Sequence, residues 1–238
     1  MRFFFRKLLF GKRSMAERHA GTTINKRLRN IKAIWNNQNE DDIGIEKILR
    51  LFLAFTQFIF PGLYIRHFLG GTRVVYQELC VDLYVLAKMA FPFIVIYNGW
   101  FDHPWIFWLV VYLMVETLLY VPTLIFASDI FDSPRSYRRS MLLLFFNYLQ
   151  VVFDFGVIYS HGEFMNAPFE HWFDGIYFSF IAGATVGFGD FHPITPLGKF
   201  LVSAQTVMFL IFAALFLNFF SNKVERKGYF EPNKSDIE

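Results

Sequence analysis

Apolar residues gather in four long runs along the chain, and each run has the length of a membrane-spanning helix. The runs cover residues 79–97, 105–127, 140–159 and 198–220. A helix needs roughly 20 mostly apolar residues to cross the ~30 Å hydrocarbon core of a bilayer. The pattern therefore predicts an all-α membrane protein with four transmembrane helices.

A fifth apolar stretch, residues 51–65, lies between Arg50 and Arg66 and contains Pro61-Gly62 near its end. It would be about 22 Å long as a helix with a rise of ~1.5 Å per residue. Counting it as a span would place the basic amino-terminal region outside, against the positive-inside rule. We expect an interfacial helix near residues 45–69 on the inner leaflet, and a spanning helix remains the alternative.

The composition agrees with a membrane protein, because 55% of the 238 residues are hydrophobic and only 18% are charged. Basic residues outnumber acidic ones before residue 51, and the linker 135–139 is also basic. With four spans, the rule places both termini and this linker in the cytoplasm. We expect an integral protein of the plasma (cell inner) membrane. A basic segment can bind nucleic acid, but in a chain this apolar we expect no nucleic-acid partner.

At the amino end, the apolar triplets 3–5 and 8–10 alternate with Arg and Lys. This pattern favours attachment to anionic lipids of the inner leaflet. A plug that enters the pore from the cytoplasm has a similar composition and is the alternative.

A short segment between the third and fourth runs carries the candidate chemistry. Residues 171–184 fit a half-helix that ends inside the membrane, followed by a re-entrant loop, Thr-Val-Gly-Phe-Gly-Asp at 185–190. Glycine at 187 and 189 permits positive φ, so that successive carbonyls can face one axis and replace the water shell of K⁺. The half-helix would point the negative end of its dipole at the ion, and Asp190 would concentrate cations at the outer mouth.

Residues 140–222 resemble the pore module of potassium channels, which consists of an outer helix, a pore helix, a selectivity filter and an inner helix. The resemblance rests on the filter sequence at 185–190, preceded by two extra spans. It implies a homotetramer around a central pore that conducts K⁺ passively and selectively, with K⁺ as the permeant ion and no cofactor. It implies that these residues form the filter: Thr185, Val186, Gly187, Phe188 and Gly189, with K⁺ held at the first four.

This resemblance divides the chain into four parts. They are a cytoplasmic basic region (1–78), a transmembrane hairpin (79–139), the pore module (140–222) and a short cytoplasmic tail (223–238). Two positions depart from the family pattern. Phe188 replaces the more frequent tyrosine, and Ile181 stands where some members have an acid. These changes predict a filter held by packing more than by hydrogen bonds, which makes the filter a candidate gate.

Ionisable residues inside the spans are the other candidates, because charge in a membrane is costly. Lys88 and Glu116 lie at similar depths in the first two spans, which predicts an interhelical pair; a proton-sensing role for Glu116 is the alternative. Asp154 is expected to hydrogen-bond to the pore helix. Histidines flank the outer mouth and could make conduction depend on external pH: His161, His171 and His192.

Other functions fit the sequence less well. The second span contains no basic residue, so we expect no voltage sensor of the arginine-rich kind. A potassium-uptake transporter resembles four fused pore repeats, whereas this chain shows one. A non-selective channel is disfavoured by the intact Gly187 and Gly189. We expect no enzyme, because no nucleophile–base constellation is visible.

Overall fold

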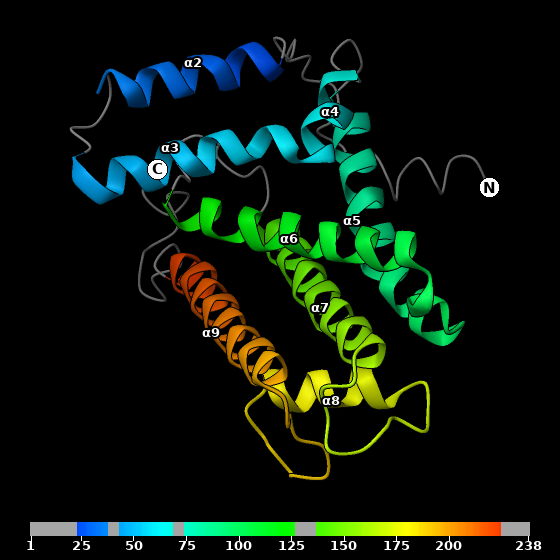
Figure 1. Cartoon of the computed structure of the whole chain (residues 1–238). Coiled ribbons are helices and arrows are strands. Elements are labelled where there is room, and N and C mark those ends of the chain that lie inside the picture. The colour runs from blue at the N-terminus through cyan, green and yellow to red at the C-terminus, as the bar shows by residue number, and fades with distance from the viewer. Residues whose placement is uncertain (1–22, 38–42, 69–73, 127–136, 225–238) are drawn as a thin grey trace, which may run out of the picture. The chain divides into compact units, whose positions relative to one another are not determined.

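The computed structural model describes residues 23–37, 43–68, 74–126 and 137–224, and these are helical apart from turns and loops. Four described helices are long and apolar enough to cross a membrane, which confirms the all-α membrane fold. These helices, which can be followed in Figure 1, are α5 (Val74–Tyr97), α6 (Pro104–Phe126), α7 (Tyr137–His161) and α9 (Pro196–Val224). The predictions for the amino-terminal triplets and most of the tail lie outside the described residues, as do the first two residues of the linker, whose last three residues begin α7.

The chain divides into two compact units, and the division runs through α5 and α6. One unit comprises Met1–Lys88 and Val115–Asp132, and the other comprises Met89–Met114 and Ser133–Glu238. Each unit is therefore built from two separate stretches of chain.

The first unit contains the segment that precedes the spans. Its helices are α2 (Thr23–Trp35), α3 (Gly44–Thr56), the 3₁₀ turn η1 (Gln57–Ile59) and α4 (Pro61–Phe68). The stretch 51–65 is therefore interrupted: Phe60 is extended (φ −80°, ψ 122°) before Pro61, as the residue before a proline tends to be. At ~1.5 Å per residue, neither α3 nor α4 alone is long enough to span a bilayer.

Helix α3 has two different faces. One face packs on α2, where Leu51 and Ala54 belong to a cluster with Ile31 and Ile34. The residues at spacings of three and four on the other face are exposed and apolar: Ile45, Ile48, Phe52 and Phe55. This two-sided pattern is typical of a helix that lies in a membrane interface, and the membrane position of α3 stays a prediction.

In the second unit, α7 and α9 contact each other, and the short helix α8 (Asp174–Gly183) packs across both near one end (Figure 1). The turn after α5 contains the 3₁₀ helix η2 (Trp100–Asp102), which contacts α7. The core cluster combines residues from α5, α6, α7 and α8: Val95, Ile96, Val110, Val157 and Ile176.

Two glycines allow the close approach of α7 and α8. A Cβ on Gly175 would lie 2.2 Å from Ser160 Oγ and 2.8 Å from the Gly156 carbonyl oxygen. A Cβ on Gly156 would lie 3.3 Å from the Ile176 backbone. Because backbone atoms cannot move aside cheaply, this crossing has no room for a larger residue at position 175.

Replacing Gly175 with alanine is expected to destabilise the second unit by about 1–3 kcal/mol, the usual effect of overpacking a tight core. The measurement is thermal unfolding of the purified protein in detergent. Gly62→Ala on α4 is the matched control, since a Cβ there meets nothing within 4 Å. Equal melting temperatures for the two variants would contradict the close packing of α7 on α8.

Candidate ion-conduction site

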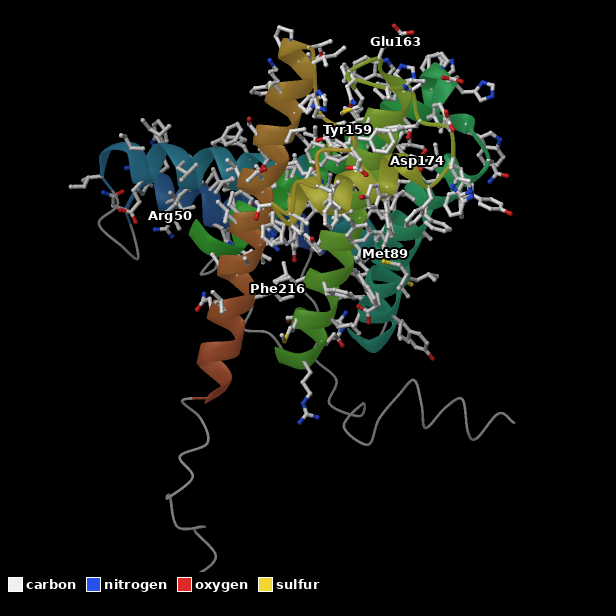
Figure 2. The ribbon with its side chains drawn as sticks, turned by 90° about the horizontal axis from the view of Figure 1, so that it is seen from below. Arg50, Met89, Tyr159, Glu163, Asp174 and Phe216 are labelled. Atoms are coloured by element: carbon white, nitrogen blue, oxygen red, sulfur yellow. The ribbon has the colours of Figure 1, made fainter. Side chains whose placement is uncertain are left out.

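The site begins at the amino end of α8, where the Asp174 side chain binds the backbone of the preceding loop. The Asp174 Oδ2 atom accepts hydrogen bonds from the backbone N–H groups of Glu170 (3.0 Å) and His171 (2.8 Å). This carboxylate ties the preceding loop to the first turn of α8, where a negative charge also suits the helix dipole. Asp174, the first residue of α8, is labelled in Figure 2.

At its other end, α8 runs directly into the segment 185–190. The N–H of Thr185 donates to the Ala182 carbonyl (3.2 Å), and the N–H of Val186 donates to the Ile181 carbonyl (2.9 Å). These bonds hold the first residues of the segment against the carboxyl terminus of the helix. The segment therefore starts at the negative end of the α8 dipole, which favours a cation.

Every second residue of this segment has a positive φ. The angles are 56° at Thr185, 59° at Gly187 and 88° at Gly189. Thr185 is β-branched, and a left-handed conformation costs such a residue on the order of 1–3 kcal/mol. Carbonyls alternate sides in an ordinary extended strand, whereas alternating the sign of φ turns successive carbonyls toward one side.

The segment is also open on the surface of the single chain. Residues 184–190 are exposed, and the apolar Val186 and Phe188 are 51% and 71% exposed. A Cβ built at Gly187 or Gly189 would meet nothing within 4 Å. This backbone thus has free space beside it, into which an ion or another chain can fit.

Hydrogen bonds hold the outer end of the segment at Asp190, whereas a filter held more by packing stays a prediction for residues 185–189. The Tyr177 hydroxyl bonds to the Asp190 carboxylate. Asn166 donates from Nδ2 to the Asp190 carbonyl (3.2 Å) and accepts the His192 N–H at Oδ1 (2.8 Å). The outer-mouth residue Asp190 is therefore tied both to α8 and to the loop before it.

The hydrogen bond from Tyr177 is the main cause that lowers the pKa of Asp190, and backbone N–H groups of Asp190 and Phe191 act in the same direction. The stabilisation is present above the ordinary pKa of the carboxyl and is lost as pH falls through the lowered pKa.

We expect Tyr177→Phe to raise the pKa of Asp190 toward its ordinary value, so that external acid reduces current at a higher pH than in the wild type. The measurement is an external pH titration of current. Tyr97→Phe is the control, because Tyr97 contacts Trp172 through its ring. An unchanged titration in Tyr177→Phe would mean that Asp190 does not set the acid sensitivity of conduction.

The outer histidines have different surroundings. His161 Nδ1 lies 3.8 Å from Asp102 Oδ1, and its ring lies 4.1 Å from that of Phe107. His171 accepts the Phe173 N–H at Nδ1 (3.2 Å). A role for these histidines in pH dependence stays a prediction.

The other predicted residue of α7 is Asp154, which is buried. Its Oδ2 accepts a hydrogen bond from Gln150 Nε2 of the same helix (2.8 Å). Ser179 forms a direct link between α7 and α8, because its Oγ donates to the Val152 carbonyl (2.6 Å). The expected bond between Asp154 and α8 stays a prediction.

Lys88 of the first span and Glu116 of the second come together within the first unit. Lys88 Nζ lies 3.6 Å from Glu116 Oε2, and both side chains are buried. Lys88 also donates to Thr117 Oγ1 (2.8 Å), while the Tyr84 hydroxyl donates to Glu116 Oε2 (2.6 Å). Each charge thus has both an ionic and a hydrogen-bonding partner, as buried charges require.

Sequence reasoning missed Tyr177 and Asn166. Tyr177 lies one helical turn before Ile181, on the same face of α8. Because position 181 has no acid that could pair with Asp190, a polar side chain one turn earlier was the signal for another partner. Asn166 is in an irregular loop, and no spacing rule relates it to residues 190 and 192.

Residues 142–226 match a family model described as "Ion channel". Comparisons with curated proteins and with solved structures gave no match. Residues 142–226 therefore form an ion channel domain, and this domain together with the four apolar helices supports an integral membrane protein that is a channel subunit.

Proposed function

We propose that this channel is selective for potassium and that its filter is the segment Thr185–Gly189. The observation that carries the proposal is the positive φ at positions 185, 187 and 189. A backbone of this form can present the carbonyl oxygens of 185–188 as a cage that replaces the hydration shell of K⁺. The Thr185 hydroxyl adds a ligand at the inner end.

One chain supplies only one wall of such a cage, and the channel is therefore a homotetramer. Residues 184–190 are exposed in the single chain, and irregular backbone at membrane depth must be buried in protein or line a water-filled path. Four chains around an axis complete the oxygen rings and bring four Asp190 carboxylates to the outer mouth, where they raise the local cation concentration.

Conduction is passive and is not driven by a charged voltage-sensing helix. Helix α6 contains no Lys or Arg, and the Lys88 of α5 is paired with Glu116. Voltage sensors need several basic residues in one span. No catalytic step is part of this function.

The topology follows from the charge distribution. The basic amino-terminal region and the basic linker support a cytoplasmic position for both termini. The plasma membrane is the location that we propose for the channel. The exposed apolar face of α3 supports contact of the amino-terminal region with the inner leaflet, where anionic lipids would attract its basic residues.

The test is ion flux from the purified protein in liposomes, with reversal potentials measured in opposed K⁺ and Na⁺ gradients. A reversal potential that follows the K⁺ gradient is expected. One that follows both gradients equally would show a non-selective cation channel. Flux that requires a coupled gradient would show a transporter.

A further inference from the structure

A buried glutamine on the inner helix α9 bonds directly to the pore helix α8. Gln205 Nε2 donates to the backbone carbonyl of Ser179 (2.8 Å) and to Ser179 Oγ (2.7 Å). The Tyr159 hydroxyl of α7 donates to Gln205 Oε1 (2.8 Å). Three helices thus meet at one side chain, and Figure 2 shows Tyr159 close to α8.

The hydrogen bonds in this network are mutually consistent. The Ser179 hydroxyl donates its proton to the Val152 carbonyl, so its oxygen is free to accept from Gln205. Both amide protons of Gln205 and its oxygen are used. Gln205, Ser179 and Tyr159 are only 3%, 0% and 1% exposed, so no water is at hand to replace a lost bond, and an unpaired group there is costly.

The glutamine also touches the end of the pore helix that leads into the filter. A Cβ built on Gly183, the last residue of α8, would lie 3.4 Å from Gln205 Nε2. Gly183 is two residues before Thr185. Gln205 therefore bonds to α8 at Ser179 and also lies beside the final turn of this helix, near the first filter residue.

We propose that Gln205 is a positioning residue: through its bonds to Ser179, α9 sets the position of α8 and thereby the geometry of the filter entrance. This inference rests on the proposed potassium selectivity. Because the buried network is satisfied in this one arrangement, a shift of α9 along α8 breaks at least one of its bonds. The position of the inner helix is thereby coupled to conduction through the filter.

The experiment uses the full chain in liposomes and compares Gln205→Leu with Thr206→Val. Thr206 is the next residue of α9, and its hydroxyl donates to Val202 within the same helix (3.0 Å). We expect Gln205→Leu to assemble but to lower the K⁺/Na⁺ permeability ratio by at least about tenfold, the order of effect of leaving a buried polar group without its partner. Thr206→Val is expected to keep the wild-type ratio.

A triple variant separates positioning from simple stability. Tyr159→Phe, Ser179→Ala and Gln205→Leu together replace the polar partners with apolar groups, which can be nearly neutral for stability. We expect the triple variant to recover thermal stability but not the permeability ratio. Recovery of both would overturn the proposal, because the network would then act only through packing.

If Gln205→Leu does not fold, Ser179→Ala is the second variant, since it removes one of the two Gln205–Ser179 bonds and keeps the other. It is expected to lower the ratio by a smaller factor, and an unchanged ratio overturns the proposal. A wild-type protein without K⁺ selectivity would instead refute the proposed function, so the two failures are distinguishable.

Discussion

Gly187→Ala is expected to reduce potassium current by at least about a hundredfold while leaving the protein folded. Gly187 has a φ of 59°, and a left-handed conformation costs a residue with a Cβ roughly 1–2 kcal/mol. In a homotetramer the four copies add to about 4–8 kcal/mol, enough to favour another filter backbone. Within the chain a Cβ at 187 meets nothing within 4 Å, so the fold itself is not strained by contact. The measurement is K⁺ flux in liposomes.

The matched control is Gly99→Ala. Gly99 lies in the turn between α5 and α6, has a φ of 67° and also has open space around a built Cβ. It carries the same conformational strain away from the proposed filter. Gly99→Ala is expected to keep K⁺ selectivity. If Gly187→Ala conducts as well as Gly99→Ala, the segment 185–189 is not the ion-conducting filter.

Removing one member of the buried pair in the first unit is the second large effect. Glu116→Leu leaves Lys88 buried beside Tyr84 and Thr117, and breaking a buried pair in this way costs about 3–5 kcal/mol. The double variant Lys88→Met/Glu116→Leu removes both charges and is expected to be at least as stable as the wild type. Thermal unfolding in detergent measures both.

The same two variants, together with Glu116→Gln, decide between the two hypotheses for Glu116. A structural pair predicts that Glu116→Leu is much less stable than the double variant. A proton-sensing carboxylate predicts instead that Glu116→Gln is normally stable and assembled but has lost a pH response of conduction. Equal stability of the single and double variants would contradict the structural pair.

The sequence was informative wherever stereochemistry or solvent left little choice. Membrane helices must be long and apolar, and the predicted run at 79–97 corresponds to α5. The helix itself starts five residues earlier, at Val74. The apolar run ended short of this start because the polar Gln77 and Glu78 lie within the first turns of the helix. The alternation of glycine at 187 and 189 predicted positive φ, and the structure has it.

The sequence was silent on contacts that depend on how the helices are placed. Tyr177, Ser179 and Gln205 are ordinary polar residues in apolar helices, and nothing in their spacing pairs α8 with α9 or with residue 190. Likewise, the stretch 51–65 had the composition of one helix, but Pro61 and the extended Phe60 divide it. Local backbone propensity determined the break at Pro61, and tertiary contacts determined the pairs between helices. The periodicity of apolar residues carries no information on either.

The division of the chain through α5 and α6 bears on how this channel domain can be moved or inherited. The matched domain starts at residue 142, but Val95, Ile96 and Val110 form one core with Val157 and Ile176. A fragment that begins at 142 would leave Val157 and Ile176 without these partners. We therefore expect a transplanted pore to need the 89–114 portion of the first hairpin, because that portion supplies part of its core.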